Sequence, residues 1–277
     1  MDGEADFNSI VDSILKNHSG VGVKAFMFKV SSLHMKDYRN LDRLDSWLHI
    51  AVKPGIEELS LTLTTDGHYN FPCSLLSGQT GGLLQYGRLN YLVVVNCSGL
   101  RAIESKAPNL SSVFFAYLCK VQLSLENTCR IKILNSHGGS FAFCTDLPSI
   151  MPNLEALTVL FHAQMRAPMM PSKFLHLKFL SISVGGPAFD YLSLSSFLDA
   201  SPSLETFILG VIGELKARIS VFDDPSDLRV IPEHYHSKLR HVKIIKFSAV
   251  KSVVELTCQI VEHATSLECL TLDMLEV

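Results

Sequence analysis

Charged side chains are scarce in this sequence, and no long hydrophobic run accounts for their scarcity. Of its 277 residues, 18% are charged and 47% are hydrophobic, and 24 basic against 27 acidic side chains give a net charge of −3. This composition excludes intrinsic disorder, which requires low hydrophobicity and high net charge. The near-neutral balance gives no general attraction for nucleic acid. Apolar runs such as Tyr91–Val95 and Val113–Leu118 are far shorter than the roughly 20 residues of a membrane-spanning helix.

A secretory signal and a cysteine framework are also missing. The chain starts Met-Asp-Gly-Glu-Ala-Asp, whereas a signal peptide needs a basic start followed by an apolar core. The seven cysteines are odd in number and none forms Cys-x-x-Cys, so the sequence predicts neither a zinc knuckle nor a redox pair. Several cysteines lie in apolar runs, where the reduced residue behaves as a small hydrophobe. We therefore expect a reducing compartment, the cytoplasm or the nucleus.

Motifs for catalysis and metal binding are incomplete. Gly78–Gly82 lacks the Gly-Lys-Ser/Thr end of a phosphate-binding loop, which leaves a flexible loop as the expectation. His137–Ser140 resembles the oxyanion-hole loop of lipases, but no Gly-x-Ser-x-Gly elbow supplies a nucleophile. The His-Tyr-His segment at 234–236, with Glu233 and His241 nearby, offers metal-ligand types in a stretch typical of a polar loop. We predict no catalytic residue, no metal and no cofactor.

A short apolar template recurs along the whole chain. It reads L-x-x-L-x-L, with other apolar residues allowed in the leucine slots, and each period-two core predicts a short strand. The mean spacing of about 27 residues lies within the 20–29 expected of leucine-rich repeats, although individual intervals are irregular. The slot residues are Val23/Phe26/Phe28, Ile56/Leu59/Leu61, Leu89/Leu92/Val94, Leu110/Val113/Phe115, the weaker Thr128/Ile131/Ile133, Leu154/Leu157/Val159, Leu177/Leu180/Ile182, Leu204/Phe207/Leu209, Leu239/Val242/Ile244 and Leu267/Leu270/Leu272.

The residues that lead into the templates repeat as well. A proline precedes the first slot in Ala107–Leu110, Met151–Leu154 and Ser201–Leu204. Proline fixes φ and cannot donate a ladder hydrogen bond, so it belongs just before a strand. An acidic residue then often follows the first leucine, as at Glu155, Glu205 and Glu268.

Helical patterns lie between several of the templates. Phe7–Leu15 has apolar residues at i, i+3, i+4, i+7 and i+8, and Gly20 follows, as expected of an amphipathic helix and its terminator. These patterns place partial helices between the strands. The other predicted helices run over Leu41–Leu48, which stops before Pro54, over Tyr191–Ala200 with one or two turns, and over Val253–Ala264.

The alternation of strand, loop and partial helix is typical of a leucine-rich repeat solenoid. We predict an irregular α/β leucine-rich repeat solenoid, or horseshoe, with a parallel concave sheet and partial helices on the convex side. Residues 1–22 are expected to form an N-terminal helix and lead-in, and residues 23–277 a domain of about ten irregular repeats. An ordinary doubly wound α/β domain is the alternative, but it leaves the repeated Pro-x-Leu-Glu segment unexplained.

Several segments resemble one protein family. Leu44–Leu61, Met151–Leu157, Ser266–Leu272 and the stretch from Phe7 to Gly20 are similar to segments of plant F-box/leucine-rich repeat proteins, a family that often carries an FBD-type C-terminal region. The resemblance implies that the repeats select the substrate of a cullin-based ubiquitin ligase, whose F-box binds a Skp1-type adaptor. No F-box is recognisable in this sequence, so we expect adaptor binding only through an F-box encoded upstream.

The positions between the leucine slots give a candidate binding surface. Strand side chains alternate between faces, so these positions are expected to point onto the concave sheet. Aromatic side chains there are of the type enriched in interface hot spots, and basic ones favour an acidic peptide. A register slipped by one residue would instead make them core, and a covering loop would hide them. The predicted partner-binding residues are Tyr91, Phe114, Arg130, Lys132, Phe179 and Lys243.

These observations together predict a non-enzymatic protein-interaction domain. The leading hypothesis is the substrate-recognition region of an F-box-type ubiquitin ligase component without its own F-box. A stand-alone leucine-rich repeat scaffold unconnected with ubiquitin is the first alternative, and a small-molecule receptor is the second. The expected partner is an unidentified protein, with no nucleic acid and no membrane.

Overall fold

The computed structural model describes residues 4–17, 23–30, 43–52, 55–63, 69, 88–95, 109–116, 130–139, 141–161, 166–186, 189–212, 228–229 and 235–274. The chain forms two compact units, which we call unit 1 (Met1–Ile131) and unit 2 (Lys132–Val277). Each unit is described by itself. Among the helices of the described ranges, none combines the length and the hydropathy needed to cross a membrane.

Unit 1 contains four parallel strands and two helices. The strands are β1 (Ala25–Val30), β2 (Glu58–Leu63), β3 (Tyr91–Val95) and β4 (Ser112–Ala116), and the helices are α1 (Glu4–Asn17) and α2 (Leu44–Ala51). The strands pair in chain order, with Leu59 aligned to Phe26 on one side and to Leu92 on the other. Their leucine slots therefore stack in register, as the repeats predicted.

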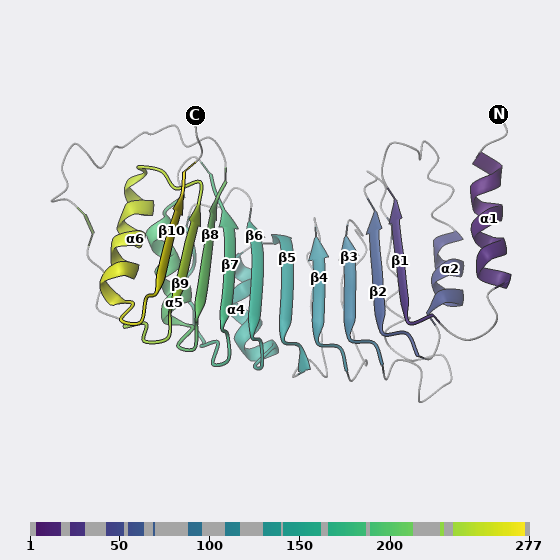
Figure 1. Ribbon diagram of the computed structural model, residues 1–277, viewed down its shortest axis with the longest axis horizontal. Coiled ribbons are helices and arrows are strands. Elements are labelled where there is room, and N and C mark those ends of the chain that lie inside the picture. Colours follow the sequence, from purple (N-terminus) through teal and green to yellow (C-terminus); the bar gives the residue numbers. More distant parts are fainter. Residues whose placement is uncertain are drawn as a thin grey trace. The chain divides into compact units, whose positions relative to one another are not determined.

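Unit 2 contains six parallel strands, again paired in chain order. Helices follow several of them, and Figure 1 shows α4 and α5 behind the strands. The elements are β5 (Ile133–Gly139), α4 (Phe141–Ile150), β6 (Ala156–Phe161), β7 (Phe179–Val184), the 3-10 helix η3 (Tyr191–Leu194), α5 (Ser195–Asp199), β8 (Thr206–Val211), β9 (His241–Ile245), α6 (Lys251–His263) and β10 (Cys269–Asp273).

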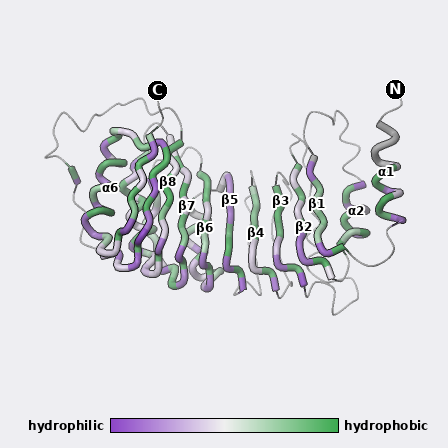
Figure 2. The backbone as a smooth tube through the Cα atoms, in the orientation of Figure 1, coloured by the Kyte–Doolittle hydropathy of each residue, from purple (hydrophilic) through white to green (hydrophobic). Residues whose placement is uncertain are grey.

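The leucine slots form the core of each unit. Leu59 and Leu61 in unit 1 and Leu180 and Ile182 in unit 2 are completely buried. Burial alternates along strands such as β2 and β7, and Figure 2 shows hydropathy changing residue by residue along the strands. Each fully buried aliphatic side chain of this size contributes about 1.5–3 kcal/mol relative to its exposed state. The repeated template thus explains why an apolar, charge-poor chain forms this parallel α/β leucine-rich repeat fold.

A ladder of charged residues crosses unit 2 just before the strands begin. Each member occupies the second position of its template, and its backbone N–H donates to the carbonyl of the member before it, as from Glu155 to Lys132 and from Lys178 to Glu155, both at 2.8 Å. The side chains alternate in sign from strand to strand, so like charges are two strands apart, with an opposite charge between them. We call this set the charged ladder: Lys132, Glu155, Lys178, Glu205, Arg240 and Glu268.

The structure corrects one repeat of the sequence interpretation. The slots of the β5 repeat are Ile131, Leu134 and Ser136, three residues beyond the predicted Thr128/Ile131/Ile133 set. Leu134 is fully buried opposite Leu157, whereas Ile133 is 42% exposed. The slip arose because the third slot holds a serine, which the apolar template did not recognise. Thr128 lies outside the described residues.

The helices were predicted with one omission. The described α1, α2 and α6 confirm three of the predicted helices, and η3 followed by α5 confirms the short turns over Tyr191–Ala200. Helix α4 was missed because it contains Pro148, and an internal proline removes one helical hydrogen bond. Phe141, Cys144 and Leu147 of α4 are all buried, and burial of this face outweighs the loss.

The corrected register gives a stability prediction. Leu134→Ala should lower the free energy of unfolding by about 2–4 kcal/mol, because it removes buried methyl groups and leaves a cavity. Ile133→Ala, the neighbouring control on the open side, should cost about 1 kcal/mol or less. Urea denaturation followed by circular dichroism measures both changes, and equal losses would contradict the register.

Candidate binding surface

The side chains of β5–β10 that point away from the core form a surface, which we call the open face of unit 2. Its side chains come from alternate strand positions, and the parallel register lines them up in three rows that run across the strands. The first row is Ile133, Ala156, Phe179, Thr206, His241 and Cys269; the second is Asn135, Thr158, Ser181, Ile208, Lys243 and Thr271; the third is His137, Leu160, Ser183, Gly210, Ile245 and Asp273.

The open face of unit 2 changes character from β5 to β10. On β6, β7 and β8 its side chains are apolar or small and mostly half-buried. At Gly210 an added Cβ would lie 2.5 Å from the Ser183 Oγ, so a side chain there would require Ser183 to shift. On β9 and β10 the face is mostly exposed and polar, apart from the half-buried Ile245, and the Lys243 Nζ lies 4.0 Å from the Asp273 Oδ2. A half-buried apolar area therefore adjoins an exposed charged one.

Four of the predicted binding residues lie on open strand faces. Phe179 and Lys243 are on the open face of unit 2, two strands apart and in different rows. Tyr91 and Phe114 are on the corresponding face of unit 1, on the adjacent strands β3 and β4, and both are half-buried. The register is therefore as predicted for β3, β4, β7 and β9.

The placement of Arg130 and Lys132 on the sheet was wrong. Both residues precede β5, because the true template begins at Ile131 and the strand at Ile133. Arg130 is exposed and its Nη1 donates to the Asn109 Oδ1 at 2.8 Å. Lys132 belongs to the charged ladder, and its Nζ lies 2.8 Å from the Glu155 Oε1. These two cations consequently give no basic spot on the strand face.

Two ion pairs join neighbouring members of the charged ladder. The hydrogen bond from Lys132, with the nearby positive charge of the same residue, keeps the pKa of Glu155 below its usual value. At the other end, the Arg240 Nη1 lies 3.5 Å from the Glu268 Oε1. All four side chains are substantially exposed, so each pair stabilises only weakly and its charges remain available to solvent.

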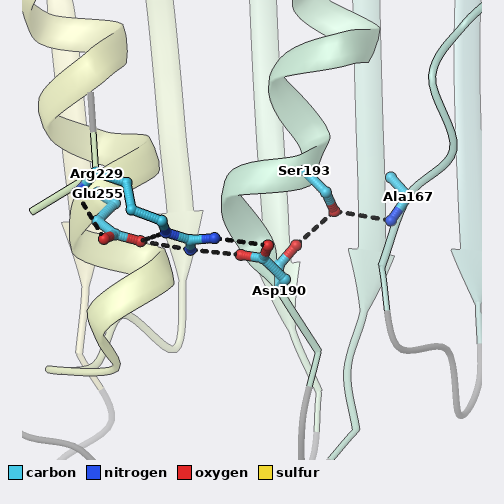
Figure 3. A network of polar contacts seen from close by, with 5 residues as sticks. All are labelled: Ala167, Asp190, Ser193, Arg229 and Glu255. Atoms are coloured by element: carbon cyan, nitrogen blue, oxygen red, sulfur yellow. Dashed lines mark hydrogen bonds and ion pairs between the residues drawn. The ribbon is translucent and has the colours of Figure 1, made fainter. Parts of the chain in front are cut away.

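A partly buried ion-pair cluster lies on the helical side of unit 2 (Figure 3). Arg229 bridges Asp190, which precedes η3, and Glu255 of α6. Its Nη1 and Nη2 donate to the two Asp190 carboxylate oxygens at 2.9 and 2.7 Å. Its backbone N donates to the Glu255 Oε1 at 2.9 Å, and its Nε and Nη2 to the Oε2 at 3.0 and 2.6 Å. We call this the Arg229 clasp.

The clasp also connects to a neighbouring segment. The Ser193 Oγ donates to the Asp190 carbonyl oxygen at 2.5 Å and accepts a hydrogen bond from the Ala167 backbone N at 2.7 Å (Figure 3). The Glu255 side chain is fully buried, whereas that of Arg229 is about half exposed. One guanidinium therefore satisfies a buried carboxylate and ties residues 228–229 to α6 and η3.

Removing the guanidinium should destabilise unit 2. Arg229→Ala leaves the buried Glu255 carboxylate without its cation, and we expect a loss of roughly 2–4 kcal/mol in the free energy of unfolding. The double variant Arg229→Ala/Glu255→Gln should recover part of this loss, since a buried neutral amide costs less than a buried charge. Arg240→Ala, which removes an exposed pair, is the control and should cost about 1 kcal/mol or less. Urea denaturation measures all three, and equal losses for Arg229→Ala and Arg240→Ala would refute the clasp.

The clasp also predicts a pH dependence. The hydrogen bonds from Arg229 lower the pKa of Asp190, so the folded state binds this proton less readily than the unfolded state does. The resulting stability is present above the unfolded pKa of about 3.9 and is lost as pH falls through the lower folded value. Arg229→Ala removes the cause of the pKa shift. The difference in free energy of unfolding between wild type and this variant should therefore shrink below about pH 4. Urea midpoints measured between pH 7 and pH 3 test this, and a constant deficit would contradict it.

The other candidate residues for metal binding or catalysis are not assembled into a metal site within the described ranges. The His236 Nε2 lies 3.7 Å from the Asp199 Oδ1, and the His241 Nε2 lies 3.9 Å from the Glu268 Oε2. The described ranges contain no group of three or more His, Cys, Asp or Glu arranged to hold a metal ion. Burial raises the pKa of the Cys144 thiol, which opposes formation of a reactive thiolate. Glu233, His234, Ser140 and the Gly78–Gly82 loop lie outside the described residues.

Comparison with known proteins agrees with the repeat pattern. A family model described as At1g61320/AtMIF1, LRR domain, matches residues 14–87 and 83–277 of this chain. The two matches together take in every strand from β1 to β10. Searches of curated proteins and of solved structures returned no significant match.

Proposed function

Because the chain belongs to the At1g61320/AtMIF1 leucine-rich repeat family, we propose that it is a non-catalytic protein-binding module. More specifically, we propose that it is the substrate-recognition region of an F-box-type ubiquitin ligase component in the cytoplasm or nucleus. The observation that carries the proposal is the open face of unit 2, where six parallel strands present in-register rows of side chains.

The open face of unit 2 has the make-up of a partner-binding surface. Phe179 lies among half-buried apolar and small side chains, which suits an apolar anchor from the partner. Exposed polar groups lie at one end of the face, on His241, Lys243 and Asp273. Opposite charges on a partner would pair with these groups and fix its position and orientation on the face. The strands hold both areas in fixed positions through continuous backbone pairing, so little conformational freedom is lost on binding.

The corresponding face of unit 1 provides a second contact area in this proposal. Tyr91 and Phe114 are half-buried on adjacent strands, and Val93 stands next to Phe114 in the same row. Arg130 of unit 1 and Lys132 of unit 2 each fit the rim of a contact area on their own unit better than its centre, since each is exposed and already bound to a neighbour. The FBD-type assignment stays a prediction.

Altering the open face of unit 2 should abolish partner binding without unfolding the protein. The test variant is Phe179→Ala/Lys243→Glu, and the control Val261→Ala/Lys238→Glu makes the same charge change at exposed positions off the strand faces. Affinity purification with quantitative mass spectrometry should show proteins that bind wild type and the control but are depleted roughly tenfold or more with the test variant. Unchanged binding by a folded test variant would refute the open face as the site.

A second measurement separates ligase from scaffold. If the chain selects ubiquitination substrates, a protein captured through the open face should be degraded more slowly when this chain is depleted or when cullin activation is inhibited. A scaffold unconnected with ubiquitin would bind the same protein without changing its half-life. Cycloheximide chase of the captured protein distinguishes the two outcomes, and Phe179→Ala/Lys243→Glu should behave like depletion.

A further inference from the structure

The last strand of unit 2 has an incompletely covered core side. Leu270 and Leu272 of β10 occupy leucine slots but are 37% and 39% exposed. Their register partners on β9, Val242 and Ile244, are buried. Within the described residues β10 pairs with a strand on one side only, so it presents both an unpaired backbone edge and uncovered apolar side chains.

The first strand of unit 1 is in a matching condition. Among the described strands β1 pairs with β2 alone, and its slot residues Phe26 and Phe28 are only half-buried. Their equivalents Leu59 and Leu61 on β2 are fully buried. Like β10, β1 therefore has the side-chain pattern of an internal strand and the exposure of a terminal one.

Helix α1 precedes β1 and has an exposed apolar face. Asp12 holds the opposite face of α1 on α2, since its Oδ1 accepts from the Trp47 Nε1 at 2.7 Å and its Oδ2 from the Arg43 Nη1 at 2.6 Å. Ile10 and Ile14 are each two residues from Asp12, and therefore lie about 200° around the helix. They are 47% and 63% exposed.

The charges at the two ends are complementary. Alignment of the templates places Glu268 of β10 level with Lys24 of β1, and Asp273 level with Lys29. All four side chains are exposed. If β1 were placed next to β10, the positive charge of Lys24 would come after the negative charge of Glu268 and would extend the alternation of the charged ladder by one step. Within unit 1, the Lys24 Nζ lies 3.6 Å from the Glu57 Oε1. The strand edges thus match in backbone, in apolar side chains and in charge.

We propose that the protein associates head to tail with a second copy of itself, through parallel pairing of β10 of one copy with β1 of the next. The template register places Leu270 beside Phe26 and Leu272 beside Phe28. In unit 2, α6 precedes β10 in the chain and packs against η3, with Val253 and Leu256 buried. Helix α1 precedes β1 in the same way, so its Ile10 and Ile14 would cover the leucines of β10. Such an interface joins two different surfaces, and it repeats from copy to copy unless a ring closes.

Charge-reversal variants test this interface in the full chain. The tail variant is Glu268→Lys/Asp273→Lys, and the head variant is Lys24→Glu/Lys29→Glu. The control Asp146→Lys/Glu262→Lys makes the same charge change as the tail variant at exposed helix positions. Analytical ultracentrifugation over a range of concentrations should show reversible association of wild type and control. Each end variant alone should raise the dissociation constant roughly tenfold or more, because like charges then face each other.

Mixing provides the decisive arm of the experiment. An equimolar mixture of head and tail variants should restore association, since every mixed junction again brings acids to bases. Ile14→Ser should weaken association of otherwise wild-type protein while leaving its thermal unfolding midpoint unchanged, as Ile14 is exposed. A wild type that stays monomeric at high concentration, end variants that associate as wild type does, or a mixture that fails to associate would each overturn the proposal.

Discussion

Parallel register between successive strands is the constraint on which the rest of this structure depends. Each short strand has one apolar side that it cannot bury alone, and its neighbours provide the remaining contacts. In unit 2, backbone hydrogen bonds join one charged-ladder residue to the next and set this register where the strands begin; in unit 1, Glu57, Asn90 and Ser111 make the equivalent bonds. Because side chains alternate along a strand, a slip of a single residue would send the leucines to solvent and the open face into the core.

Once the register is set, it creates three different surfaces from one repeat. The leucine slots become the core, the intervening positions become the rows of the open face, and the second template position becomes the charged ladder. Each of the three surfaces has its own chemical requirement. Core positions require apolar side chains that fill the interior, whereas ladder positions accept a charge opposite to that of the neighbouring ladder residue. A family of such proteins is therefore free to vary its open face while keeping its fold, as expected of a module that recognises other proteins.

The slots of most repeats could be found in the sequence, but one polar substitution was enough to misplace a repeat. Ser136 is buried in a leucine slot, and a search for apolar residues passed over it. That error also concealed the charged ladder, because the slipped template placed Cys129 rather than Lys132 in the second position. With Lys132 restored, basic residues at 132, 178 and 240 alternate with the acidic residues at 155, 205 and 268. The sequence had shown only the acidic half of this pattern.

The sequence by itself determined the parallel α/β repeat, most strand and helix positions, and the aromatic residues on the open strand faces, because these follow from local spacing between apolar residues. Only the tertiary structure decided which repeat begins at Ile131, that α4 forms in spite of Pro148, and that Arg229 joins Asp190 to Glu255 across 39 and 26 residues. Such contacts depend on side chains distant in sequence being buried together, and no local pattern records which carboxylates a single guanidinium will meet.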